Sequence, residues 1–362
     1  MHVLVTGGAG YIGSHAAKRL AQAGHVPVVL DNLVRGHLQA VRWGPLVVGD
    51  LADPAVLDQA FHSYPIEAVL HFAALAYVGE SMSAPADYFR NNTTNTLNLL
   101  DAMRNHRVNV LVFSSTCAVY GNPLRQPITE DTPAAPVNPY GESKLMVERM
   151  LHWHGEAYGL KWVALRYFNA AGADIEGELG ELHDPEPHLI PRVIGAAHGA
   201  IPALEVFGSD YDTPDGTAVR DYIHVTDLAE AHALALDHLW KGGAGGIFNL
   251  GTGRGHSVRE VVQAVEAVTG RRVPLRESGR RPGDPPVLVA ATGRVRTVLG
   301  WQPRHSTLPT IVETANKWHL ANSAASIMTL NAASIVALRA ASTAAADAAS
   351  IAAEDAASIT QR

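Results

Sequence analysis

The stretch Thr6-Gly7-Gly8-Ala9-Gly10-Tyr11-Ile12-Gly13-Ser14 decides the fold of this chain. Its glycines follow a Gly-x-x-Gly-x-x-Gly spacing directly after the apolar run His2–Thr6. Glycine is needed where the backbone turns tightly, where it must approach a ligand without a Cβ, and where a helix packs closely on a strand. Free N–H groups at the start of the following helix attract phosphate. The sequence therefore begins with a strand, a phosphate-binding turn and a helix.

Short β-branched runs alternate with segments of helical spacing along the first part of the chain. The predicted strands are His2–Thr6, Pro27–Leu30, Leu46–Val48, Ala68–Phe72 and Val108–Ser114. The predicted helices between them include Ile12–Ala23, Ala55–His62 and Ala86–Arg107. Alternating strands and helices fold as right-handed βαβ units. We therefore predict an α/β protein with a doubly wound parallel sheet of the Rossmann type.

A carboxylate ends the second predicted strand. Asp31 stands 18 residues after Gly13, where it can accept hydrogen bonds from the adenosine ribose hydroxyls and repel a 2′-phosphate. This pattern predicts NAD as the cofactor, although Arg35 nearby could accept a 2′-phosphate. Asp50, after the third strand, is either an acceptor for the adenine amino group or the cap of a helix that begins near Pro54.

Composition limits the partners and the location of the chain. The 362 residues include 28 Lys+Arg and 35 Asp+Glu, a formal net charge of −7, which excludes an electrostatically driven nucleic-acid binder. No uncharged apolar stretch reaches the roughly 20 residues of a membrane span, and the first residues carry no cationic export signal. The single cysteine, Cys117, excludes an intrachain disulfide. We expect a cytoplasmic protein with no membrane partner.

Three regions follow from the pattern. We expect residues 1–170 to form the NAD-binding Rossmann domain. Beyond them, Gly- and Pro-rich loops with helices such as Leu189–His198 and Val258–Thr269 indicate a smaller α/β substrate-binding domain over residues 171–320, with a chain that can cross back between the two. Residues 321–362 are an Ala/Ser-rich tail in which Ala-Ala-Ser recurs every eight residues, and we assign no function to it.

Tyr140 and Lys144 form the most informative pair of reactive side chains. They lie four residues apart at a predicted helix start, with Asn138 as the cap and Pro139 at the first helical position. Residues at this spacing share one helix face, so the ammonium can lie near the phenol and, together with the positive nicotinamide ring of NAD+, lower its pKa from about 10. With Thr116 after the fifth strand, the pair predicts a site for proton transfer.

These residues resemble the extended short-chain dehydrogenase/reductases, and among them the UDP-glucose (UDP-galactose) 4-epimerases. The resemblance runs from Met1 to about residue 320 and is carried by Thr6–His15, Asp31–Leu33, His71–Ala74, Val78–Ser81, Phe113–Gly121, Tyr140–Lys144, Arg166–Gly172, Gly208–Val225 and Arg281–Asp284. It implies oxidation of the sugar at C4 with bound NAD, turning of the 4-ketose in the site, and reduction on the opposite face.

The resemblance also implies individual roles. Tyr140 is the base, Thr116 hydrogen-bonds the sugar 4-oxygen and the phenol, and Lys144 holds the nicotinamide ribose. The implied NAD contacts are Gly7, Gly10, Tyr11, Ile12, Gly13, Asp31, Asn32, Leu33, Asp50, Leu51, Phe72, Ala73, Ala74, Asn91, Ser114, Tyr140, Lys144 and Tyr167. The implied UDP-sugar contacts are Thr116, Tyr140, Asn169, Leu189, Val206, Phe207, Arg220, Tyr222, Arg281, Asp284 and Leu288. A homodimer through Ala86–Arg107 and Pro139–Gly159 is implied as well.

Several departures from the family pattern leave alternatives open. Cys117 and Ala118 stand where nucleotide-sugar dehydratases carry an Asp-Glu pair, which disfavours dehydration. UDP-pentose 4-epimerases, uronic-acid epimerases and decarboxylases remain alternatives, as does an idle NAD-binding scaffold. Leu288 is intermediate in size where Tyr restricts the sugar pocket, which predicts secondary activity on N-acetylated UDP-hexoses. His188 replaces a frequent Asn, so that substrate contact is open.

The 18 histidines do not follow the spacing of a metal site. His152 and His154 are two residues apart, whereas two ligands on one helix face stand four apart. His183 and His188 fall in a Pro-rich loop, and the chain has no Cys cluster. We therefore expect surface and capping roles for the histidines and no metal.

Overall fold

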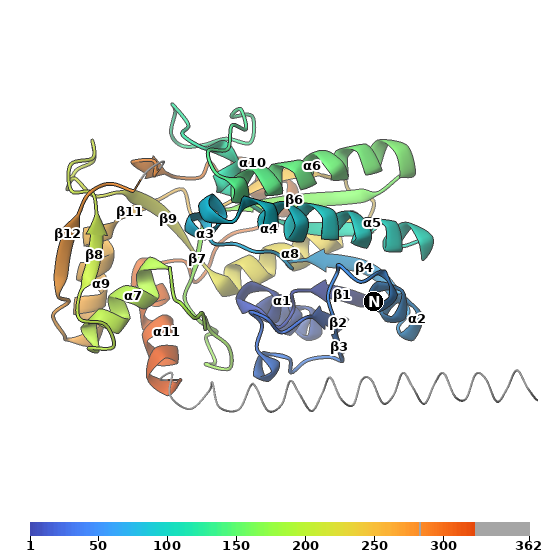
Figure 1. Cartoon of the computed structure of the whole chain (residues 1–362), viewed down its shortest axis with the longest axis horizontal. Coiled ribbons are helices and arrows are strands. Elements are labelled where there is room, and N and C mark those ends of the chain that lie inside the picture. Colours follow the sequence, from blue (N-terminus) through green and yellow to red (C-terminus); the bar gives the residue numbers. More distant parts are fainter. Residues whose placement is uncertain (282–283, 323–362) are drawn as a thin grey trace, which may run out of the picture.

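The computed structural model describes residues 1–281 and 284–322 (Figure 1). Its largest element is a seven-stranded sheet with the strand order β10-β6-β5-β4-β1-β2-β3. Every pair of neighbouring strands in it is parallel. The order reverses at β1, where one half of the sheet runs toward β2 and the other toward β4, and such a switch point opens a crevice for ligands. The predicted doubly wound parallel sheet is confirmed.

The strands of this sheet lie close to the predicted runs. They are β1 (His2–Thr6), β2 (Val26–Asp31), β3 (Leu46–Val48), β4 (Ile66–His71), β5 (Val110–Thr116), β6 (Lys161–Tyr167) and β10 (Gly246–Leu250). The helices packed on them are α1 (Tyr11–Gln22), α2 (Pro54–Ser63), α5 (Asn95–Asn105), α6 (Pro139–Tyr158), α8 (Val225–Trp240) and α10 (Gly293–Leu299). The first five strands deviate from their predicted bounds by at most two residues.

Successive residues of the strands face opposite layers of helices. Val3 and Val5 of β1 belong to a buried cluster with Leu236 of α8, whereas Leu4 between them packs in a second cluster with Leu100 of α5. Figure 1 shows α5 and α6 on one side of the sheet and α1 and α8 on the other. The strands are therefore buried on both faces, which explains their continuous apolar sequences.

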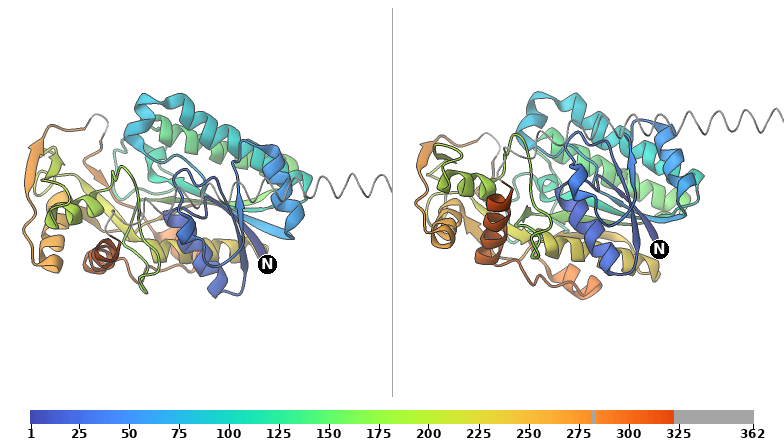
Figure 2. Two further views of the ribbon diagram at one scale, coloured as in Figure 1. Left: turned by 60° about the horizontal axis from the view of Figure 1, so that its bottom comes forward. Right: turned by 90° about the horizontal axis from the view of Figure 1, so that it is seen from below.

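A smaller assembly lies at one end of the large sheet (Figure 2). Its strands are β7 (Asn169–Ala171), β8 (Leu204–Phe207), β9 (Val219–His224), β11 (Gly255–Ser257), β12 (Leu275–Ser278) and β13 (Val287–Leu288). Its helices are α7 (Leu189–Ala197), α9 (Val258–Thr269) and α11 (Leu308–Ala321). β9 pairs with β7, β11 and β13, and β8 pairs with β12. The chain returns to the large sheet through α8 and β10 before it completes this assembly.

The helix predicted over Ala86–Arg107 is interrupted. The structure has α3 (Val78–Ser83), α4 (Pro85–Tyr88), a π-helix (Phe89–Thr94) and then α5. The Asn92 side chain explains the interruption, because its amide binds the backbone N and O of Leu75 at 2.8 and 2.9 Å and donates to Ser143 Oγ at 3.0 Å. The wider turn of the π-helix lets the Asn92 amide reach both Leu75 and Ser143, which a regular α-helix would not allow.

The predicted tail falls outside the described residues from residue 323 onward. Within residues 1–281 and 284–322, no helix combines the length and the apolar character that crossing a membrane requires.

Candidate active site

The predicted cofactor residues gather beyond the carboxyl ends of the parallel strands. Thr6, Asp31, Val48, His71 and Thr116 end β1, β2, β3, β4 and β5. The predicted NAD residues that follow β1, β2, β3 and β4 are Gly7, Gly10, Tyr11, Ile12, Gly13, Asn32, Leu33, Asp50, Leu51, Phe72, Ala73 and Ala74. Ser114 and Tyr167 lie at the carboxyl-terminal ends of β5 and β6, and Asn91 lies on the π-helix. Parallel topology thus brings separate segments to one edge of the sheet.

The glycine loop between β1 and α1 leaves no room for side chains. Gly7 has φ +69°, and a Cβ there would lie 2.6 Å from the backbone N of Ala73. A Cβ on Gly13 would lie 2.3 Å from the carbonyl oxygen of Gly7. Gly10 is the N-cap of α1 and offers no capping side chain. The exposed backbone N–H groups at this helix start fit a pyrophosphate.

Asp31 organises the turn after β2. Its carboxylate is 7% exposed and accepts the backbone N–H groups of Ala9 and Leu33, both at 2.9 Å. Burial raises the pKa of this carboxyl, and the two backbone hydrogen bonds lower it. Arg35, which could have met a 2′-phosphate, instead forms a bidentate pair with Glu80 at 2.8 and 2.9 Å. The arrangement suits a ribose better than a phosphate.

Asp50 is not a helix cap. Its carboxylate accepts the Asn32 side-chain amide at 2.7 Å and the backbone N–H of Ala52 at 2.8 Å. The cap of α2 is Asp53, whose carboxylate accepts the N–H of Ala55 at 2.9 Å. The capping alternative for Asp50 is therefore wrong, and its carboxylate stays on the cofactor side of β3.

Tyr140 and Thr116 are brought together by α6 and β5. Asn138 caps α6 by accepting the N–H of Gly141 at 2.8 Å, and Pro139 is the first helical residue, as predicted. Burial raises the pKa of Tyr140 to about 12, and the nearby Thr116 side chain opposes this rise.

Lys144 is buried against the end of β5. Its ammonium is 2% exposed, donates to the carbonyl oxygen of Ser114 at 2.8 Å and lies 4.8 Å from the centre of the Phe113 ring. Burial lowers the pKa of Lys144 to about 7, and Glu148 opposes that shift. Burial alone raises the pKa of Tyr140, so a lowering of that pKa by Lys144 and the nicotinamide ring together stays a prediction.

The predicted substrate residues are assembled by the pairing of β9. In the strand register Tyr222 lies opposite Asn169 of β7, and Arg220 lies opposite Leu288 of β13. Asn169 donates its amide to the carbonyl oxygen of Asp221 at 3.0 Å. Arg220 pairs with Asp284 and also donates to the Val219 carbonyl at 2.8 Å. Four residues from three strands therefore share one small sheet.

A second group of predicted substrate residues lies around β8. Val206 is buried and Phe207 is half-buried at the end of this strand. The Arg281 guanidinium stacks over the Phe207 ring, with its carbon 4.0 Å from the ring centre. Leu189 is the first residue of α7. An aromatic ring and a guanidinium at contact distance can enclose a planar base or approach a phosphate.

Leu288 and Cys117 belong to the same buried cluster at the side of Thr116. Leu288 is 9% exposed, and burial raises the pKa of the Cys117 thiol to about 12. The thiol therefore stays protonated and acts as a packing group, as its small size and missing base predict.

Comparisons with known proteins agree with this geometry. The family model for the NAD dependent epimerase/dehydratase family matches residues 3–251. This chain belongs to that family. Proteins named UDP-glucose 4-epimerase from Halalkalibacterium halodurans and Azospirillum brasilense are 50% and 52% identical to this family member over 319 and 317 residues. The alignments cover 88% and 87% of this chain, and 96% and 91% of the two relatives.

Solved structures resemble this epimerase/dehydratase family member at similar coverage. The UDP-glucose 4-epimerase of Brucella ovis, in complex with NAD, is 56% identical, with a TM-score of 0.85 over 87% of this chain and 97% of that chain. The enzyme from Bifidobacterium longum, in complex with NAD+ and UDP, is 39% identical, with a TM-score of 0.85 over 89% and 99%.

Two buried charged groups of this family member were not predicted. Glu148 is 3% exposed, accepts Ser115 Oγ at 2.5 Å and forms a bidentate pair with Arg166, at 2.8 Å to Nε and 2.5 Å to Nη2. The sequence did offer one signal for Glu148, because it stands four residues after Lys144 and therefore shares its helix face. A buried ion pair stabilises the structure around it only when its charged atoms are hydrogen-bonded. Here both oxygens of Glu148 accept hydrogen bonds, so the pair holds the end of β5 in place.

Asp221 is the second unpredicted group in this epimerase/dehydratase. Its fully buried carboxylate accepts the backbone N–H groups of Thr252, Gly253 and Ala290 at 2.8 to 3.2 Å, and the Thr252 hydroxyl at 2.7 Å. It therefore joins the loop after β10 to β9 and to the segment after β13. No spacing in the sequence could reveal these partners, because they lie 31 to 69 residues away.

Proposed function

We propose that this chain interconverts UDP-glucose and UDP-galactose by NAD-dependent epimerisation at C4. The observation that carries the proposal is that Thr116 at the end of β5 and the Tyr140 phenol at the start of α6 lie close together, beside the dinucleotide loop. Relatives named UDP-glucose 4-epimerase that match nearly their whole length support the same reaction.

The dinucleotide loop fits NAD. The backbone N–H groups at the start of α1, which Gly10 leaves without a capping side chain, would receive the pyrophosphate, and the remaining acceptor positions of Asp31 would meet the ribose hydroxyls. When bound, NAD supplies the hydride acceptor and donor of the reaction together with a positive charge on the nicotinamide ring. We also assign to this cofactor the remaining contacts that the sequence predicts, including Asn91, Ser114 and Tyr167.

Tyr140 moves the proton of the sugar 4-hydroxyl. With a pKa of about 12 in the free chain, the phenol is protonated at neutral pH. A positive charge in the cofactor pocket and a protonated Lys144 both favour the phenolate. Binding of the cofactor therefore lowers the pKa of Tyr140 and allows it to act as the base. The Thr116 hydroxyl, close to the phenol, passes the proton from the sugar 4-hydroxyl to Tyr140 and later returns it to the 4-oxygen.

The UDP end must stay fixed while the 4-keto sugar turns over. We assign this anchoring to Arg220, Asn169 and Tyr222 on the β7–β9 pair, with Arg281, Leu189, Val206 and Phe207 around the nucleoside and Asp284 at its ribose. The chain is acidic overall, with a net charge of −7, so it is these placed guanidinium groups that offset the diphosphate. We therefore assign residues 171–320 mainly to the substrate.

Leu288 sets the breadth of the sugar pocket in this proposal. Because leucine is smaller than tyrosine and carries no hydroxyl, it leaves volume for an N-acetyl group on the sugar. We propose measurable but secondary activity on UDP-N-acetylglucosamine. A kcat/KM for that substrate at the level of background contradicts this assignment.

We also propose that the protein is a cytoplasmic homodimer. The helices of residues 95–105 and 139–158 carry large exposed apolar side chains, with Leu97 42% exposed, Trp153 67% and Tyr158 56%. Exposed apolar groups gathered on neighbouring helices are typical of an association surface. Light scattering of the wild type and of Trp153→Glu tests this, with a dimer and a monomer as the expected masses. The single free cysteine supports a reducing compartment.

The decisive experiment is a turnover assay on purified protein. UDP-galactose and NAD+ are supplied, and UDP-glucose is measured, with UDP-pentose and UDP-uronic acid substrates in parallel. We expect Tyr140→Phe to lower kcat by about 10²- to 10⁴-fold, whereas Tyr158→Phe on the same helix leaves it unchanged. No turnover by the wild type, or a Tyr140→Phe variant as active as the wild type, rejects the mechanism. Faster turnover of a UDP-pentose or a UDP-uronic acid would replace UDP-galactose as the assigned substrate.

A further inference from the structure

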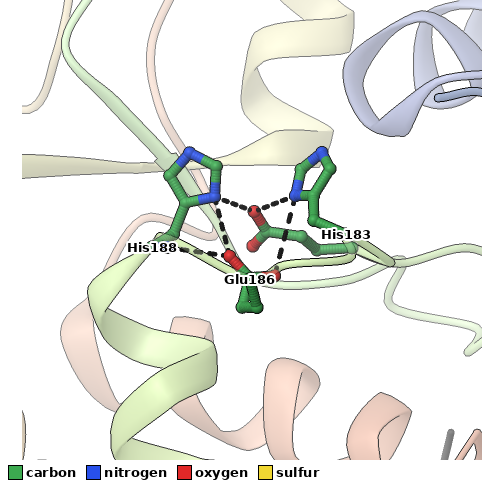
Figure 3. A group of neighbouring side chains, drawn as sticks. His183, Glu186 and His188 are labelled. Carbon is green, nitrogen blue, oxygen red and sulfur yellow. Dashed lines mark hydrogen bonds and ion pairs between the residues drawn. The ribbon is translucent and has the colours of Figure 1, made fainter. Parts of the chain in front are cut away.

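Four side chains converge in the loop between β7 and α7. Glu181, His183, Glu186 and His188 each offer one ligand atom, and these four atoms all lie within 4.8 Å of one another. Figure 3 shows the imidazole rings of His183 and His188 turned toward Glu186 from the two sides of the loop. This group lies outside the catalytic pair at Tyr140.

The distances among these side chains fit a small tetrahedral ion. His183 Nδ1 lies 3.0 Å from Glu181 Oε1 and 3.6 Å from Glu186 Oε2. His188 Nδ1 lies 2.6 Å from Glu181 Oε1 and 2.9 Å from Glu186 Oε1. Ligands bound tetrahedrally to Zn²⁺ at about 2.0 Å lie about 3.3 Å from one another, which falls inside this range.

Hydrogen bonds alone cannot satisfy all the contacts among these four side chains. Each Nδ1 carries at most one proton but faces two carboxylates, and both rings share the same oxygen of Glu181. A dication would instead receive a lone pair from each neutral ring and be balanced by the two carboxylates. An anion is disfavoured, because it would meet both carboxylates at the same point.

The surrounding structure holds the loop in this shape. The carbonyl oxygen of Glu181 accepts from the Trp318 indole at 3.1 Å, and the carbonyl of Leu182 bonds to His37 Nε2 at 2.8 Å. The Glu181 side chain is 7% exposed, whereas that of His188 is 44% exposed. Glu181 therefore holds the buried side of the group in place, and the exposed side at His188 lets an ion enter.

Two other groups with suitable ligand atoms are less well prepared. Asp174, Glu176 and Glu178 are already paired with the Lys18 ammonium at 2.5 to 2.9 Å. In the group of Asp58, His62 and His106, the side chains of Asp58 and His62 are 60% and 69% exposed. Neither combines two imidazoles and two carboxylates around one point.

We propose that Glu181, His183, Glu186 and His188 form a binding site for a divalent metal ion of the zinc type. The bound ion fastens the loop that joins β7 to α7, close to the glycine loop on one side and the start of the substrate helix on the other. This assignment departs from the expectation drawn from histidine spacing, and it stands independently of the proposed epimerase activity.

Metal binding by the purified full chain tests the proposal directly. After dialysis against Zn²⁺ and removal of free ion, we expect one equivalent of zinc per chain by mass spectrometry in the wild type. Co²⁺ in its place is expected to give the visible absorption of a tetrahedral site. The double variant His183→Gln, His188→Gln loses both signals, whereas His152→Gln, which changes an exposed histidine of α6, retains them.

A second variant guards against a folding defect. Glu186→Gln keeps the shape of the side chain and is expected to weaken Zn²⁺ binding roughly tenfold or more, with an unchanged circular dichroism spectrum. Zn²⁺ should also raise the Tm of the wild type and leave the Tm of the double variant unchanged. Equal zinc content in the wild type and the double variant, or no bound zinc in either, shows an ion-pair cluster only and overturns the proposal.

Discussion

The dinucleotide side and the sugar side of the candidate site are constructed in opposite ways. The first is centred on one continuous stretch, Thr6–Ser14, in which the critical glycines are separated by a few residues, although residues at or after the ends of β2 to β6 complete it. The second uses Asn169, Arg220 and Leu288, which become neighbours only through the pairing of β7, β9 and β13. A local motif can therefore be identified from spacing, whereas a site made by strand register has to be folded before it exists.

This contrast predicts that the two sides can be damaged separately. A change in the glycine loop should affect stability and cofactor retention together, because the loop is packed against the sheet. A change on β9 should affect the substrate while the cofactor side persists. The following variants test that separation, beginning with the largest effect.

Gly13→Ala should be the most damaging of these changes. Its Cβ would lie 2.3 Å from the carbonyl oxygen of Gly7, which we expect to lower the free energy of unfolding by about 3 kcal/mol and to remove bound NAD. Chemical denaturation and the absorbance of retained cofactor measure both. Gly79→Ala is the matched control, because nothing lies within 4 Å of a Cβ there. A Gly13→Ala variant that keeps NAD and full stability would refute the close-packing account.

Arg220→Met should act on the substrate side alone. Removing a charged hydrogen-bond donor from the diphosphate should raise KM for UDP-galactose about 30-fold, or about 2 kcal/mol, with NAD retention unchanged. Steady-state kinetics and cofactor content together provide the measurement. The exposed Arg254 offers a control as Arg254→Met. Loss of NAD in the Arg220→Met variant would show that the two sides are coupled.

Leu288→Tyr should change the choice of sugar. A larger ring in place of leucine is expected to lower kcat/KM for UDP-N-acetylglucosamine about tenfold while UDP-galactose changes much less. Leu124→Tyr, at a fully exposed position, is expected to alter neither value. Parallel losses on both substrates would mean that Leu288 supports packing and does not select the sugar.

Lys144 should make stability depend on pH in a defined direction. Its pKa is about 7 in the folded chain and 10.5 as the ordinary value, so between these pH values the unfolded chain binds a proton that the folded chain does not. Stability therefore rises with pH across this window, by about 1.4 kcal/mol per pH unit at most. Unfolding of NAD-stripped wild type and Lys144→Met between pH 7 and 10 measures the difference. Identical slopes would contradict a depressed lysine pKa.

Much of the fold was accessible from the sequence because its signals are local. The strands deviate little from their predicted bounds, and Asn138 caps α6 as expected. The helix over Ala86–Arg107 was predicted without its π-helix, because the cause is the distant contact of Asn92 with Leu75 and Ser143. Capping by Asp53 instead of Asp50 shows the same limit at short range, where two neighbouring aspartates carry equal signals.

The residues themselves determined the α/β class and predicted the phosphate-binding turn and the Tyr140, Lys144 and Thr116 set, because glycine spacing and helix periodicity act over a few residues. Tertiary structure alone decided the electrostatics. It buried Lys144 on the Ser114 carbonyl, raised the pKa of Tyr140 by burial, and gathered His183 and His188 around two glutamates. Desolvation and convergence of loops depend on what surrounds a group in space, and sequence neighbours do not contain that information.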